Sequence, residues 1–112
     1  MRIQISGDTL ALDRAIRRQI ETEAGALTAR FSREPMDLRV QIAEELDQLH
    51  GHRVRCEIRI QAGRGRQWVV REAHKAASQA IAESFKNARK TIRRTLHRSL
   101  PDAPIAAAAA AS

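Results

Sequence analysis

Alternation of apolar and polar residues predicts four β-strands along the chain. In the clearest of them Val54, Cys56, Ile58 and Ile60 alternate with polar side chains, which is the pattern of a strand with one face buried. The predicted strands are residues 2–6, 38–43, 53–61 and 68–71. The segment Gly63–Arg66 between the last two supplies the glycines that a tight hairpin needs at positive φ.

Apolar residues at steps of three and four predict two helices. The first runs from Leu12, with Asp13 or Thr9 as its cap, and is closed by Pro35. Its apolar positions are Ile16, Ile20, Ala24, Leu27 and Phe31. The second runs from about Ala73 to Arg98 and carries apolar residues at positions 77, 81, 85, 88, 92 and 96.

This order predicts an α+β fold with the plan β-α-β-β-β-α, in which a four-stranded mixed sheet has both helices packed on one face. The first strand, helix and second strand form a right-handed parallel crossover, and antiparallel hairpins follow. The acidic segment Glu44–Asp47 comes after the second strand. We expect residues 1–98 to form one domain and the Pro- and Ala-rich residues 99–112 to form a disordered tail. We expect a monomer or a weak dimer.

A formal net charge of +7 on 112 residues favours a polyanionic partner. Nucleic acid fits better than a membrane, since no apolar run approaches the roughly 18 residues of a spanning helix. Without a recognisable signal peptide, we expect a cytoplasmic protein. Cys56, the single cysteine, is interpreted as a small core residue.

The polar side of the last helix is strongly basic. Between Phe85 and Leu100 it contains no acid, whereas a helix that is merely solvated usually interleaves acids with its cations. We therefore favour RNA binding over simple solvation for this arc. Its members are Lys75, Lys86, Arg89, Lys90, Arg93, Arg94 and His97.

A second basic surface is predicted on the sheet face that carries no helix. Arg53, Arg55 and Arg59 lie at two-residue steps of about 7 Å, which roughly matches phosphate spacing. Glu57 and cross-strand neighbours could equally absorb this charge, and both interpretations stay open. Because Phe31 and Phe85 fall on core stripes, we expect recognition by shape and phosphate rather than by base stacking.

The opening Met1–Gly7, the helix ending in Phe31 and the basic final helix resemble the hibernation-promoting factor and ribosome-associated inhibitor family, also called sigma-54 modulation protein or protein Y. The resemblance covers residues 1 to about 98. It implies the same fold, binding to the small ribosomal subunit in the channel used by messenger and transfer RNA, and silencing of translation. Residues 73–77 stand where the family usually has Asp-Met-Tyr-Ala-Ala, and Glu44-Glu45 stands where it usually has a Glu-Lys pair. We therefore expect a divergent short form without the dimerising carboxyl-terminal domain.

We therefore predict a non-enzymatic ribosome-associated factor that binds small-subunit ribosomal RNA. The predicted RNA contacts are Lys75, Lys86, Arg89, Lys90, Arg93, Arg94, Arg98, Arg53, Arg55, Arg59, Arg64 and Arg66. The alternatives are a module that binds an acidic protein partner and an RNA-binding module that is not specific to the ribosome. We expect no catalytic residues, cofactor, small-molecule substrate or metal, since His50 and His52 fall short of a zinc pattern.

Overall fold

The computed structural model describes residues 2–99, with side chains described as far as Leu96. Its elements are β1 (Arg2–Gly7), α1 (Arg14–Arg30), β2 (Met36–Asp47), β3 (Gly51–Ala62), β4 (Gln67–His74) and α2 (Ala77–Ser99), with two short 3₁₀ helices, η1 (Thr9–Leu12) and η2 (Gly63–Gly65). This order confirms the predicted β-α-β-β-β-α plan. The predicted tail lies outside the described residues, except that Ser99 is the last residue of α2.

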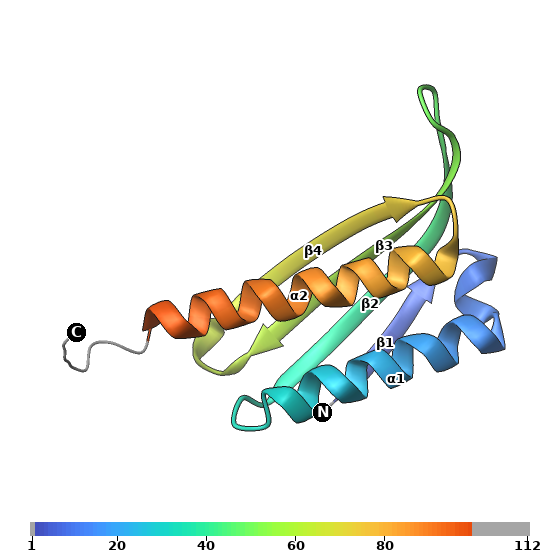
Figure 1. The fold of residues 1–112 in the computed structure, drawn as a ribbon. Coiled ribbons are helices and arrows are strands. Elements are labelled where there is room, and N and C mark those ends of the chain that lie inside the picture. The colour runs from blue at the N-terminus through green and yellow to red at the C-terminus, as the bar shows by residue number, and fades with distance from the viewer. Residues whose placement is uncertain (1, 100–112) are drawn as a thin grey trace.

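The four strands form one sheet in the order β1-β2-β3-β4. β1 pairs with β2 in parallel, with Ile5 opposite Val40, whereas the β2–β3 and β3–β4 pairs are antiparallel. Both helices cover the same face of this sheet (Figure 1). The predicted α+β fold, with a mixed sheet and two helices on one face, is therefore confirmed.

The core lies between the helices and the sheet. Every second residue from Met36 to Ile42 of β2 and from Val54 to Ile60 of β3 is buried there, as the alternation predicts, and Ile20 of α1 and Phe85 of α2 are fully buried against them. Leu12 is an exception, because its side chain is 77% exposed. The helix begins only at Arg14, after Asp13, whose side chain accepts a hydrogen bond from the backbone N–H of Ile16 at 3.0 Å.

The boundary between β4 and α2 lies further along the chain than predicted. Ala73 and His74 belong to β4, where they pair with Arg55 and Val54, and the helix begins at Ala77 rather than Ala73. The cause is that Arg55 and Val54 of β3 offer backbone hydrogen-bond partners to this segment. Pairing with a formed strand outweighs the helix propensity of alanine, which is worth less than about 1 kcal/mol per residue.

The acidic segment Glu44–Asp47 is also strand rather than connection. It continues β2 and pairs with the start of β3, with Asp47 opposite Gly51. The resulting hairpin extends beyond the two helices (Figure 1), and its residues Leu46 and Leu49 are 82% and 88% exposed.

The turn between β3 and β4 differs in detail from the prediction. Gly65 has the expected positive φ of 72°, but Gly63 does not, and Arg64 takes the second left-handed position with φ 65°. A non-glycine residue is uncommon in this region because its Cβ crowds the backbone.

Candidate nucleic-acid interface

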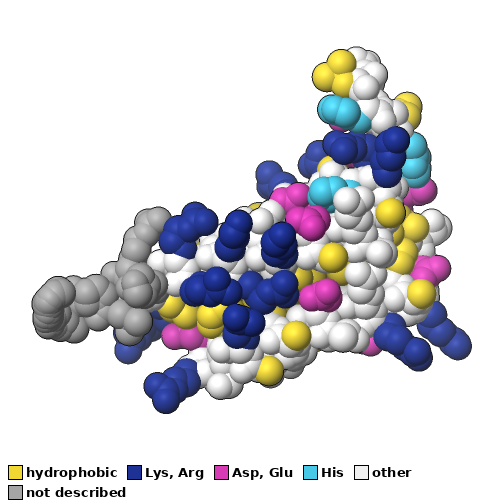
Figure 2. Space-filling view, in the orientation of Figure 1, with side chains coloured by type: hydrophobic (Ala, Val, Ile, Leu, Met, Phe, Trp, Pro, Cys, Tyr) yellow, Lys and Arg dark blue, Asp and Glu magenta, His cyan; other side chains and the backbone are white. Residues whose placement is uncertain are grey.

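Four exposed cations follow the outward side of α2, and we call them the α2 ridge: Lys86, Lys90, Arg93 and Arg94. The opposite side of the same helix carries Phe85, Ala88 and Ile92, which are fully buried. Since this apolar side is held against the sheet, the helix fixes which way the ridge faces. Figure 2 shows Lys and Arg side chains gathered over α2.

The ridge cations have no acidic partner within the described part of the chain. The ion pairs among residues 2–96 involve other arginines and the histidines, and none of them reaches Lys86, Lys90, Arg93 or Arg94. Cations one helical turn apart repel each other by a few tenths of a kcal/mol per pair when no anion separates them. The ridge is therefore suited to an external anion.

Two of the contacts predicted on this helix, Arg89 and Lys75, are placed differently. Arg89 is half-buried, and its guanidinium lies 3.5 Å from the carboxylate of Glu23, so it links α2 to α1. Lys75 is exposed but lies in the connection between β4 and α2, not on the helix. The side chains of His97 and Arg98 lie outside the described residues.

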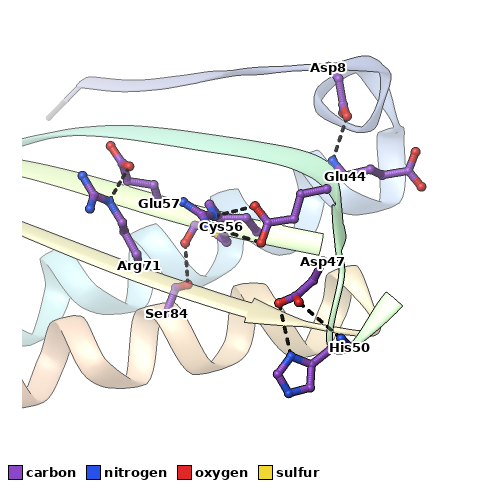
Figure 3. A network of polar contacts seen from close by, with 10 residues as sticks. Asp8, Glu44, Asp47, His50, Cys56, Glu57, Arg71 and Ser84 are labelled. Atoms are coloured by element: carbon purple, nitrogen blue, oxygen red, sulfur yellow. Dashed lines mark hydrogen bonds and ion pairs between the residues drawn. The ribbon is translucent and has the colours of Figure 1, made fainter. Parts of the chain in front are cut away.

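The arginines on the open face of the sheet are largely paired with acids. Arg55 lies 2.9 Å from Glu45 across the β2–β3 pair. Glu57 bridges Arg59 and Arg71, with 2.8 Å to each Nε, and Figure 3 shows the bond to Arg71. Of the two interpretations that the sequence left open, this geometry favours the absorption of charge within the face.

Arg53 on the same face is half-buried, and its Nε is a buried donor without a hydrogen-bond partner among the described residues. Arg2 and Arg39 are exposed, as predicted. The sheet face thus keeps a weaker positive surplus than the α2 ridge, and its cations are less free to turn toward a ligand.

Replacing Glu57 by glutamine makes the stability of the sheet face less dependent on pH. Hydrogen bonds from Arg59 and Arg71 hold the pKa of Glu57 below its usual range. A lowered carboxyl pKa stabilises the folded state above the unfolded-state pKa, and the contribution is lost as the pH falls through the folded-state value. Wild type should exceed Glu57→Gln in unfolding free energy by about 1 kcal/mol or less at neutral pH, because the arginines are solvent-screened.

Chemical denaturation of both proteins at neutral and acidic pH measures this difference. It should vanish at the acidic end, where the carboxyl is protonated in both states. An equal difference at both ends would show that the two ion pairs do not carry the effect.

The remaining candidate groups are engaged locally. His50 pairs with Asp47 at 3.2 Å and His52 with Glu44 at 2.9 Å, and no group of three or more potential ligands for a metal occurs among the described residues. The Cys56 thiol is buried beneath Ser84, whose hydroxyl donates to the Cys56 carbonyl at 3.3 Å (Figure 3). Burial raises the pKa of Cys56 to about 11, which suits the predicted core role.

A basic cavity at one end of the molecule was not predicted. Its volume is about 660 Å³, and it brings Arg30, the last residue of α1, and Arg33 beside Arg64 and Arg66 of the β3–β4 turn. Of these four arginines, only Arg64 and Arg66 were predicted contacts. The predicted topology could have indicated this cavity. The connection from α1 to β2 and the β3–β4 turn lie at the same end of the sheet, because the start of β2 pairs with the end of β3.

The chain belongs to the sigma 54 modulation protein / S30EA ribosomal protein family, which it matches over residues 3–99. This is a ribosome-associated family, as the resemblance predicted. No curated protein matches the chain. No helix in residues 2–99 combines the length and the apolar character that crossing a membrane requires.

Two solved structures share the fold. The N-terminal domain of Protein Y from Thermus thermophilus has a TM-score of 0.69 and 22% identity, covering 85% of this chain and 99% of that one. A ribosomal subunit interface protein from Coxiella burnetii has a TM-score of 0.71 and 9% identity, covering 87% and 99%. At these identities the similarity establishes the architecture alone.

Proposed function

We propose that this protein is a non-enzymatic cytoplasmic factor that binds small-subunit ribosomal RNA through the α2 ridge and silences translation. Its membership of a ribosome-associated family supports the partner. The names of the two structural neighbours, a Protein Y domain and a ribosomal subunit interface protein, point the same way.

The α2 ridge is the observation that carries the proposal. Its four exposed cations have no acidic partner among the described residues, and the buried side of α2 holds them on one surface. A phosphate backbone relieves their mutual repulsion and releases counterions on binding, which is the main source of affinity in such complexes.

The other predicted contacts take secondary roles in this proposal. Arg53, Arg55 and Arg59 are half-buried or already paired, so that binding RNA would require their ion pairs to be exchanged. Arg64 and Lys75 lie beyond the two ends of β4, are exposed and extend the basic surface beyond the helix. Arg66 is half-buried and already paired with Glu34 at 2.6 Å. Arg89 supports the ridge by joining α2 to α1.

Binding to purified small ribosomal subunits should weaken steeply with salt. If the four ridge cations each neutralise one phosphate, log affinity should fall against log salt concentration with a slope of about −3 to −4. Co-sedimentation over a salt series measures the slope, and a cell-free translation reaction tests for inhibition at the same protein concentrations.

Ribonuclease treatment tests the choice of partner. The protein should leave the ribosomal fraction when the RNA is digested. A complex that survives digestion would replace the RNA proposal by binding to an acidic protein surface. A salt slope near zero would contradict any binding that depends on the charge of the α2 ridge.

A further inference from the structure

The basic cavity lies where three separate segments of the chain meet. Arg30 ends α1, the following residues run to Pro35, η2 supplies the β3–β4 turn, and Leu96 reaches in from α2. Its volume of about 660 Å³ falls in the range of about 300–1,000 Å³ that is usual for small-molecule sites.

The charge around this cavity is strongly positive. Arg30, Arg33 and Arg64 are exposed, and none of them forms an ion pair with an acid in the described part of the chain. The one acid that lines the cavity, Glu34, is already held by Arg66 at 2.6 Å. The carboxyl end of α1 offsets this only slightly, since a helix terminus is equivalent to about half a charge.

The cavity also has an apolar wall. Phe31, Pro35 and Leu96 line it, and Phe31 is half-buried because α1 has already ended when the chain reaches it. Phe31 was predicted to lie wholly within the core stripe of α1, which left no aromatic surface for a base. Its ring instead has one part packed on the core and another part in the cavity wall.

Arg64 occupies a backbone conformation that favours glycine. Its φ and ψ of 65° and 28° are left-handed, although glycines stand on either side of it. Strained positions of this kind cluster at binding sites, where the side chain is needed despite the backbone. Glycine at position 64 would relieve the strain and remove the cation.

We propose that this cavity binds a nucleotide, with the phosphate held by Arg30, Arg33 and Arg64 and the base placed against Phe31 and Leu96. An inorganic anion would leave the apolar wall unused, and an apolar ligand would leave three cations unpaired. Aromatic and guanidinium groups together are the combination that binds unstacked nucleotides. The nucleotide is either free or an unpaired residue of an RNA strand, and in the second form the inference rests on the proposed function.

Titration of the isotope-labelled full-length protein with adenosine monophosphate, a short oligoadenylate and inorganic phosphate tests the proposal by amide NMR. We expect saturable shifts of the amides in residues 30–35 and 63–66. Saturation by the monophosphate identifies a free nucleotide as a sufficient ligand. Saturation by the oligonucleotide alone identifies an RNA residue.

Three variants separate binding from folding. Arg64→Gly should weaken nucleotide binding by about tenfold, the value of one charge-assisted hydrogen bond, while leaving the Tm unchanged or higher. Arg14→Gln, an exposed arginine near the other end of α1, should bind as wild type does. Phe31→Leu keeps an apolar side chain and should weaken the binding of adenosine monophosphate more than the binding of inorganic phosphate.

The proposal is overturned if neither nucleotide shifts these amides, if inorganic phosphate shifts them equally well, or if Arg64→Gly binds as tightly as wild type. No ribosome enters this experiment. Loss of nucleotide binding and loss of ribosome binding are therefore scored independently.

Discussion

Reversing the charge of Lys86, Lys90 and Arg93 to glutamate should abolish co-sedimentation with small ribosomal subunits. Each reversal replaces an attraction for phosphate by a repulsion, and three lost charge-assisted contacts weaken binding by at least about a thousandfold. The fold should persist, because these side chains are exposed and have no ion pair to lose among the described residues. The Tm should change by only a few degrees.

A matched control changes the net charge by the same amount at another surface. Arg2, Arg14 and Arg18 are exposed cations of β1 and α1, and their reversal to glutamate should leave most of the ribosome binding in place. Glutamate near the amino end of α1 is also favourable to the helix. If the ridge variant still binds and the control variant does not, the interface lies away from α2.

The α2 ridge could be predicted because its geometry depends on one helix alone. Positions separated by three and four residues share a side of any helix, so Phe85 and Ile92 define the buried side without knowledge of the rest of the fold. Arg89 could not be assigned in this way. Its partner Glu23 is 66 residues distant in sequence, and only the packing of α1 on α2 brings the two together.

The sheet face shows the same limit. Alternation placed Arg55 and Arg59 correctly on the helix-free side of the sheet. Whether they had acidic partners depended on residues of neighbouring strands, because Arg55 pairs with Glu45, and Arg71 shares Glu57 with Arg59. These neighbours follow from strand register, which the length of each turn determines. The β2–β3 hairpin is longer than its apolar alternation indicated. Lys75 lies off the helix because β4 pairs with β3 as far as His74.

The basic cavity was beyond the reach of periodicity. Phe31 looked like one more apolar position of the first helix, and only the end of that helix at Arg30 turns its ring toward the β3–β4 turn. Arg64 was identified as part of a turn, but the positive φ was expected at Gly63, and Arg64 has it instead. A site assembled from three separate segments of the chain requires the tertiary structure.

Replacing Gly7 by alanine should destabilise the fold more than any other single change of one methyl group in the sheet. A Cβ at this position would lie 1.8 Å from the carbonyl oxygen of Ile42, and the residue has a φ of 138° that side chains rarely adopt. That oxygen accepts the backbone N–H of Asp8 at 3.3 Å, and the Asp8 side chain accepts from the Glu44 N–H at 2.8 Å (Figure 3). Any shift that makes room therefore separates β1 and η1 from β2.

We expect Gly7→Ala to lower the unfolding free energy by about 3 kcal/mol or more, and the Tm by about 10 °C or more. Gly25→Ala is the control, since nothing lies within 4 Å of a Cβ there. Position 25 is an exposed site inside α1, so alanine should stabilise the protein by about 0.5–1 kcal/mol. Thermal and chemical unfolding of both variants measure the contrast, and equal stabilities would mean that the β1–β2 contact at Gly7 yields without loss.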